Sequence, residues 1–206
     1  MRPELLPKTE ALRRLARGGV IRARDLESAA IPRSYLRRLS ERGELERIDR
    51  GLYRLVGAPV TELSTLAEVS KRVPRGVICL LSALQLHELT TELPHAVWLQ
   101  IGRHDRAPAF RHPRVEIVRA SGPARTHGIG HRRIEGVQVP VTGAAKTVAD
   151  CFRYRRRVGM EVALAALRDY LASRRKHRAR TIDALVAAAR ADRVLALMRP
   201  YLEALA

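Results

Sequence analysis

The first residues that could do chemistry are an adjacent histidine and glutamate, His87-Glu88. The pair begins like the His-Glu-x-x-His helix of zinc proteases, in which two histidines one turn apart bind the metal. Position 91 is Thr91, so the second histidine ligand is missing. We therefore expect the end of a helix with a half-buried histidine here, and no metal site.

A second motif, Gly143-Ala144-Ala145-Lys146-Thr147, resembles the end of a phosphate-binding loop. Such a loop needs glycines, which let backbone N–H groups surround the phosphates. Here the first glycine is absent, and Ala145 stands where the glycine before the lysine belongs. The start of a helix that Thr142 caps explains the same residues.

Carboxylates and cysteines add no catalytic pattern. A metal-dependent nuclease needs carboxylates gathered near a lysine, whereas Glu116, Glu135 and Asp150 form no Asp…Glu-x-Lys arrangement. No Gly-x-Ser-x-Gly nucleophile elbow occurs either. Cys79 and Cys151 lie far apart and in no Cys-x-x-Cys pair, which argues against a disulfide framework and a zinc finger. The sequence predicts a chain that is not an enzyme and holds no cofactor or metal.

Charge is the most informative property of the composition. The chain has 39 Lys and Arg against 21 Asp and Glu, a formal net charge of +18. A surplus of this size favours a polyanionic partner through phosphate contacts and counterion release. Most of the basic residues are Arg, whose planar guanidinium suits phosphates and guanine edges. An Arg-rich genome would give the same composition without such a partner, so the positions of the arginines must decide.

The elements expected in the first 56 residues give these arginines their places. Helical spacing of Leu12, Leu15 and Ala16 predicts a helix over 5–16. A short strand at 20–21 and a short helix at 23–29 follow.

A third helix is expected over 32–42, with Pro32 at its first position and Gly43 as its end. Two alternating runs, 45–48 and 52–55, then predict a β-hairpin. This order of elements predicts a winged helix-turn-helix that binds double-stranded DNA.

The third helix has one apolar and one basic face. Pro32, Tyr35, Leu36 and Leu39 share the stripe that should pack on the core, and Tyr35 could place its hydroxyl on the DNA backbone. The DNA-contact candidates on the other face are Arg33, Ser34, Arg37 and Arg38. A recognition helix needs long donors in its N-terminal half, because that half enters the major groove.

The hairpin supplies the second set of candidates. Its alternation points Ile48 and either Leu52 or Tyr53 inward. Left outside, as candidates for phosphate or minor-groove contact, are Arg47, Arg50 and Arg54. A basic face together with a recognisable DNA-binding fold favours DNA contact over an ordinary solvated surface.

The rest of the chain predicts a larger mixed sheet packed by helices, so the fold class is α+β. Gly57-Ala58-Pro59 marks the boundary between a DNA-binding domain, 1–58, and a C-terminal domain, 59–206. A helix is expected at 61–72. Strands are expected at 77–80, 97–101, 115–118 and 137–141, and helices at 82–89, 142–152, 158–172, 181–190 and 192–205. The Arg-rich stretch 103–133 is either a surface for nucleic acid or an acidic partner, or a plain solvated loop.

The sequence resembles the AbiEi antitoxins. In the N-terminal region the resemblance rests on residues 19–26, 31–39 and 43–53, and in the C-terminal region on 79–90 and 146–152. It implies the repressor half of a type IV toxin–antitoxin pair, which represses its own operon at inverted repeats. It also implies a partner toxin with a nucleotidyltransferase-like fold, which the antitoxin opposes without a stable complex.

These observations predict a cytoplasmic regulator with a DNA operator as its partner, monomeric in solution or cooperative on DNA. The N-terminus, residues 1–10, has no apolar signal core, and no run of residues is long and apolar enough to span a membrane. Two alternatives are open. One is a DNA-processing, nuclease-like enzyme that the winged helix delivers to DNA. The other is a regulator whose C-terminal domain senses a ligand, against which the low aromatic content, 4%, speaks mildly.

Overall fold

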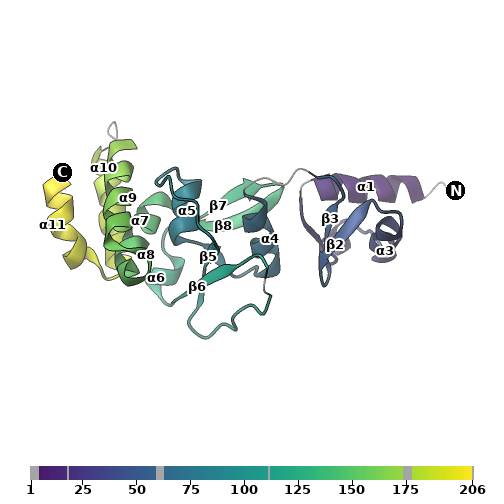
Figure 1. The fold of residues 1–206 in the computed structure, drawn as a ribbon, viewed down its shortest axis with the longest axis horizontal. Coiled ribbons are helices and arrows are strands. Elements are labelled where there is room, and N and C mark those ends of the chain that lie inside the picture. The colour runs from purple at the N-terminus through teal and green to yellow at the C-terminus, as the bar shows by residue number, and fades with distance from the viewer. Residues whose placement is uncertain (1–4, 18, 59–62, 111, 174–177, 206) are drawn as a thin grey trace. The chain divides into compact units, whose positions relative to one another are not determined.

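The chain folds into a mixed α/β structure with helices and two β-sheets (Figure 1). This computed structural model describes residues 5–17, 19–58, 63–110, 112–173 and 178–205. Contacts between Cα atoms divide the chain into two compact units. The first comprises Met1–Pro74 with Arg133–Val139, and the second comprises Arg75–Arg132 with Pro140–Ala206. The predicted boundary at Ala58–Pro59 adjoins residues 59–62, which lie outside the described residues, and it stays a prediction.

The first unit contains three helices, a small sheet and a further helix. Its elements are α1 (Leu5–Arg17), β1 (Ile21–Arg22), α2 (Asp25–Ser28), α3 (Ser34–Glu41), β2 (Leu45–Asp49), β3 (Leu52–Leu55) and α4 (Ser64–Arg72). The strands form an antiparallel sheet in the order β1-β3-β2. The three predicted helices and the hairpin are therefore confirmed. The predicted start of the helix at 61–72 lies partly outside the described residues.

Two predictions for these helices were wrong in detail. The third helix begins at Ser34 and not at Pro32. Pro32 lies in the turn before it, and the carbonyl of Pro32 accepts a hydrogen bond from the Tyr35 N–H at 3.0 Å. On α1, Leu12 and Ala16 are fully buried, whereas Leu15 is 38% exposed. Residues 12 and 16 are one turn apart and define the buried stripe, so residue 15 falls on its edge.

The β2–β3 hairpin owes its shape to its turn and to one irregularity. Gly51 has a φ of +70°, a conformation that glycine adopts without steric cost. The register shifts between Arg47 and Asp49, which marks a β-bulge beside the turn. Leu52 is buried, whereas Ile48 and Tyr53 are only half-buried. The hairpin is thus anchored on Leu52 and on Leu45 at its base.

A five-stranded sheet supplies the strands of the second unit, although its segment Arg133–Val139 belongs to the first unit. Its strands are β4 (Val77–Ile78), β5 (Val97–Gly102), β6 (Val115–Ala120), β7 (Ile129–Ile134) and β8 (Val137–Thr142). They lie in the order β6-β5-β4-β8-β7. The sheet is mixed, because β4 is antiparallel to β5 and parallel to β8, while β5 is parallel to β6. The four predicted strands are confirmed, although the first ends at Ile78 and not at residue 80, because Leu80 begins a helix; β7, an edge strand, was missed.

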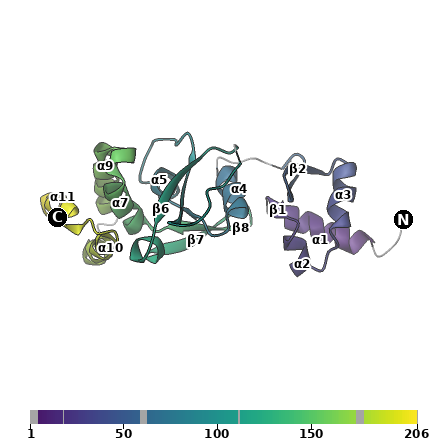
Figure 2. The ribbon, with the colours of Figure 1, turned by 90° about the horizontal axis from the view of Figure 1, so that it is seen from below.

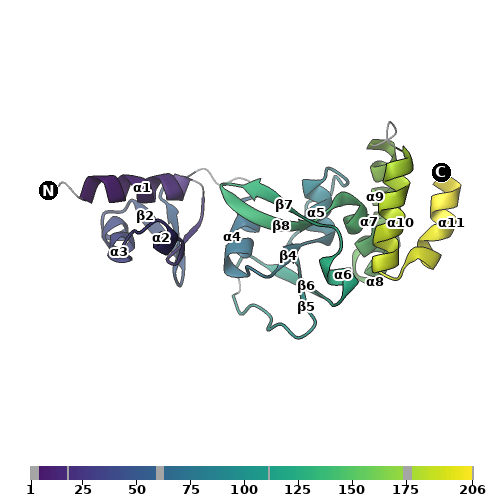
Figure 3. The same ribbon diagram turned by 180° about the vertical axis from the view of Figure 1, so that it is seen from behind.

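Helices cover this sheet and form the main core. They are α5 (Leu80–Leu86), α6 (Pro123–Thr126), α7 (Ala144–Arg153), α8 (Arg155–Val158), α9 (Met160–Ser173), α10 (Arg178–Ala191) and α11 (Leu195–Leu205). Figure 3 shows α7 among α5, α9 and α10, with which it makes contacts. Every residue of α7 from Lys146 to Phe152 is buried. Among the described residues, no helix has the length and apolar character needed to cross a membrane.

Two of these helices begin differently from the prediction, which started one at residue 82 and capped the other with Thr142. Ser82 lies inside α5, and its hydroxyl accepts the N–H of Trp98 at 3.0 Å. Thr142 is the last residue of β8, and Gly143 precedes α7 without a side-chain cap. The Thr142 hydroxyl instead shares a 2.8 Å hydrogen bond with the hydroxyl of Thr147. Both side chains join a helix to the sheet.

Candidate nucleic-acid interface

A short turn sets the angle between α2 and α3. Ala30 has a φ of 51°, and the Ile31 N–H donates to the carbonyl of Leu26 at 2.9 Å. The Ile31 side chain is buried with Leu26 and Leu36. Both helices belong to one core cluster with α1 (Figure 2). The turn therefore fixes the direction in which α3 presents its outer face.

The two faces of α3 are distinct, as predicted, but Pro32 was wrongly placed on the core-facing stripe: it lies in the turn before the helix and is exposed. Tyr35, Leu36 and Leu39 are buried, whereas Ser34 and Arg37 are exposed. The side chain of Arg37 is 81% exposed, and its Nε lies 3.6 Å from a carboxylate oxygen of Glu41. An ion pair this long between exposed groups holds the guanidinium only weakly, so Arg37 is available to a ligand.

Arg38 is placed differently from its neighbour. Its side chain is half-buried, and its guanidinium carbon lies 5.2 Å from the centre of the Tyr35 ring. One terminal nitrogen of Arg38 is buried and has no hydrogen-bond partner among the described residues. A guanidinium over an aromatic ring is a stabilising cation–π contact. Part of Arg38 thus supports the helix, and the remainder reaches the surface.

Arg33 forms an ion pair with Glu27 across the α2–α3 turn. The two side chains are 66% and 62% exposed. The guanidinium lies beside the N-terminus of α3 in this arrangement, and the carboxylate competes with any phosphate for it. Glu27 was not singled out in the sequence, because only the fold brings it next to Arg33.

The three hairpin arginines differ in how firmly they are held. Arg50 is exposed at the tip, and its guanidinium has no partner among the described residues. Arg47 donates from Nε to the carbonyl of Asp49 at 3.1 Å. Arg54 is 22% exposed and pairs with Glu46 at 2.6 Å. Arg50 is therefore the best candidate for a phosphate contact, and Arg54 the weakest.

Two ion pairs join α4 to this region of the first unit. Lys71 lies 2.5 Å from Asp25 at the start of α2, and Arg72 lies 3.3 Å from Asp49 in the hairpin. Asp25 also accepts the Arg22 N–H at 2.8 Å. These carboxylates are thereby neutralised near the surface that carries the arginines.

The Arg-rich stretch 103–133 contains two kinds of arginine. Arg119 donates to the carbonyls of Gly102, Arg103 and Asp105 at 3.1, 2.9 and 2.7 Å, and Arg125 pairs with Asp105 at 3.2 Å. These two hold the loop together. Exposed arginines whose guanidinium groups have no partner among the described residues are Arg103, Arg106, Arg114, Arg132 and Arg133. Arg111 lies outside the described residues.

The motif that resembles a phosphate-binding loop is not a surface loop at all. Lys146 is 1% exposed and lies between Asp150 and Asp192, with its Nζ 2.9 Å from Asp192. Burial opposes the charge on Lys146, but the two carboxylates keep its pKa above the ordinary value. Burial raises the pKa of Asp150 to about 8; Lys146 opposes this shift, and the Asp192 carboxylate adds to it. This cluster was missed in the sequence, although a lysine and an aspartate one turn apart within an apolar run could have indicated it.

Asp150 makes the stability of the second unit depend on pH. The carboxyl stays protonated in the folded chain up to about pH 8, whereas an ordinary Asp ionises near pH 4 in the unfolded chain. The folded state binds the extra proton between these values, so this group's contribution to stability falls as the pH rises from about 4 to about 8. We expect Asp150→Asn to flatten this dependence, by at most about 1.4 kcal/mol per pH unit. Urea unfolding at several pH values measures it. Equal slopes for the two proteins would refute the assignment.

The other motif, at His87, is structural. His87 Nε2 lies 2.7 Å from the carbonyl oxygen of Thr142, which fastens the end of α5 to β8. Within the described residues, no three His, Cys, Asp or Glu side chains are grouped in a way that could hold a metal ion.

Comparison with known proteins identifies the N-terminal segment. A search of curated proteins finds no match. The crystal structure of the RV2827C protein from Mycobacterium tuberculosis is similar, with 16% sequence identity and a TM-score of 0.46, over 82% of this chain and 76% of that one. Residues 10–56 match the family described as "Transcriptional regulator, AbiEi antitoxin". The match runs from α1 to just beyond β3 and includes all of α2, α3 and the hairpin. Residues 10–56 are therefore similar to the AbiEi antitoxin family of transcriptional regulators.

Proposed function

We propose that the chain is a repressor that reads a double-stranded DNA operator with inverted repeats through a winged helix-turn-helix. The helix α3 is its recognition helix, and the β2–β3 hairpin is its wing. The observation that carries the proposal is the exposed basic face of α3 within the segment that matches a family of transcriptional regulators. Arg33, Ser34 and Arg37 lie in the N-terminal half of α3 or directly before it, which is the half that enters the major groove in this class of proteins.

In this proposal the chain has two functional parts. Residues 1–58 form the DNA-binding domain, and residues 59–206 carry the antitoxic or assembly role. The protein regulates its own operon and counteracts a toxin with a nucleotidyltransferase-like fold, without forming a stable complex with it. A reading frame of that fold next to this gene, and relief of its toxicity on co-expression, would test this second half.

DNA binding is tested by titrating the full chain against the DNA upstream of its own coding sequence and against a scrambled duplex of the same length. We expect tighter binding to the upstream DNA, with a steep dependence on salt because phosphate contacts release counterions. Equal affinity for both duplexes would show that the protein does not read sequence. Incubation with Mg²⁺ in the same tubes tests the nuclease-like alternative, which predicts cleavage.

The free guanidinium at the tip of the wing leads to a specific expectation. Arg50→Ala should weaken binding to the upstream and the scrambled duplex equally, and should lower the salt slope by about one unit, because one phosphate contact is lost. Gel-shift titrations at four salt concentrations measure the slope. The matched control is Arg54→Ala, which removes the same charge from a side chain already held by Glu46 and should change the slope less. An unchanged slope in Arg50→Ala would place the tip in solvent.

The ion pair between Arg33 and Glu27 leads to a second expectation. Glu27→Gln keeps the shape of the side chain but removes the carboxylate that competes with phosphate for Arg33. We expect binding to scrambled DNA to become about two- to fivefold tighter, because exposed pairs of this kind contribute up to about 1 kcal/mol. The ratio of the affinities for upstream and scrambled DNA should fall by a similar factor, because only the binding to scrambled DNA becomes tighter. Glu10→Gln, on the exposed side of α1, removes the same charge elsewhere. If both variants bind scrambled DNA alike, Glu27 has no special role.

A further inference from the structure

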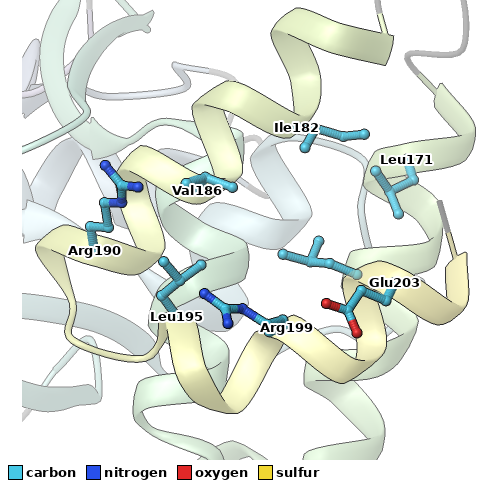
Figure 4. Close-up of a pocket in the computed structure, with 8 residues that line it drawn as sticks. Leu171, Ile182, Val186, Arg190, Leu195, Arg199 and Glu203 are labelled. Carbon is cyan, nitrogen blue, oxygen red and sulfur yellow. The ribbon is translucent and has the colours of Figure 1, made fainter.

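The second unit contains a pocket that the proposed DNA interface does not use. It lies between α9, α10 and α11 and has a volume of about 290 Å³ (Figure 4). The residues that line it are Leu171, Ile182, Val186, Arg190, Leu195, Arg199, Leu202 and Glu203. This volume lies just below the range for small-molecule sites, roughly 300–1,000 Å³.

The pocket has an apolar floor that the helical repeat explains. Ile182, Val186 and Arg190 follow one another at intervals of four residues, so they form one stripe along α10. Leu195, Arg199 and Leu202 form the corresponding stripe on α11. Each stripe therefore combines aliphatic side chains with one arginine. From Ile182 to Arg190 the stripe is about 12 Å long, at 1.5 Å per residue.

The charges of the pocket are separated along its length. In Figure 4, Arg190, Leu195 and Arg199 lie at one end, and Leu171, Ile182 and Glu203 lie at the other. Arg190 and Arg199 are exposed, and neither guanidinium pairs with a carboxylate of the described residues. Two uncompensated arginines beside an apolar surface attract an anion and leave its hydrocarbon part in contact with the leucines.

From this arrangement we propose that the pocket binds an amphipathic organic anion, with an aliphatic chain of about eight to ten carbons and one carboxylate or sulfate-like head. The head group lies against Arg190 and Arg199, and the chain runs along Val186, Ile182 and Leu171. Glu203 repels a negative head at the far end and so fixes the direction of the ligand. A neutral or cationic head of the same length gains nothing from the arginines.

The test uses the full chain and alkyl compounds of one length. Isothermal titration calorimetry with octanoate, octyl sulfate, octanol and octylammonium separates the head group from the chain. We expect both anions to bind at least about tenfold more tightly than the alcohol and the ammonium, because two charge-assisted contacts are lost with the latter. Butyrate should bind weakly, since it leaves most of the apolar floor empty.

Two variants locate the site. Arg190→Gln/Arg199→Gln should reduce octanoate affinity at least about tenfold, and Val186→Phe should abolish binding by filling the pocket while both arginines remain. Arg168→Gln removes an exposed arginine of α9 and should bind octanoate normally. Circular dichroism checks that each variant is folded. Equal affinity for octanoate and octylammonium, no binding of either anion, or normal binding by the double variant would each overturn the proposal.

Discussion

Replacing Lys146 with methionine should destabilise the second unit by roughly 3–5 kcal/mol. The ammonium group is 1% exposed and lies between Asp150 and Asp192, which are themselves almost completely buried. Without it, the Asp192 carboxylate faces the protonated Asp150 carboxyl inside the core, and the charge of Asp192 has no other cation within ion-pair distance among the described residues. Removing one partner from a buried charged cluster costs more than the cluster contributes, because it leaves uncompensated charge.

The measurement is urea unfolding followed by the fluorescence of Trp98. This is the only tryptophan of the sequence, and it is buried in the core of the second unit. Its emission therefore reports on the unit that contains the change. Lys8→Met makes the same substitution on the exposed surface of α1 and should alter stability by less than about 0.5 kcal/mol. A loss of similar size in both variants would mean that the cluster is not what holds α7 to α10.

Arg37→Ala should weaken binding to the upstream DNA by about 1–3 kcal/mol, and should weaken binding to scrambled DNA much less. Arg37 has the most exposed side chain of the paired arginines, and its ion pair with Glu41 is the longest, at 3.6 Å. A base contact adds to binding only where the right base is present, so its loss reduces discrimination. Arg33→Ala should act in the same direction, less strongly, because Glu27 already competes for that guanidinium.

Arg42→Ala is the matched control for this experiment. Arg42 follows the last residue of α3 and is exposed, so the same charge is lost at the opposite end of the helix from the half that we propose enters the groove. We expect a small and equal loss on both duplexes. Equal losses in Arg37→Ala as well would show that α3 contacts phosphates but does not read bases.

The first unit could be predicted from the sequence to within a few residues. Its signals are local: alternation in the runs that became β2 and β3, a glycine at the hairpin turn, and apolar spacing on α3. The exposed position of Arg37 followed directly from that spacing. The grouping of Arg38 with Arg37 did not anticipate that Arg38 folds back over the Tyr35 ring, because a contact of that kind depends on which rotamer the core permits.

The second unit was harder for a physical reason. The β7 segment has three consecutive exposed residues, His131, Arg132 and Arg133, so it lacks the apolar alternation of a strand, and only its pairing with β8 makes it one. Likewise, Arg119 and Arg125 look like part of a charged surface, but the fold gives them carbonyl and carboxylate partners. Composition cannot separate such arginines from exposed ones, because only the tertiary structure shows which guanidinium groups have partners.

Because both cysteines are buried, the rate at which they react with a disulfide reagent reports how often the surrounding core opens. Cys79 and Cys151 are free and fully buried, and burial raises the pKa of both thiols. A thiol in this state reacts with a disulfide reagent only when the surrounding core opens, since the thiolate is the reactive form. The sequence has no other cysteine, so the first unit contributes nothing to the labelling. The rate of thiol labelling therefore measures how often the second unit alone opens. It can be compared with and without bound DNA, and it needs no engineered cysteine.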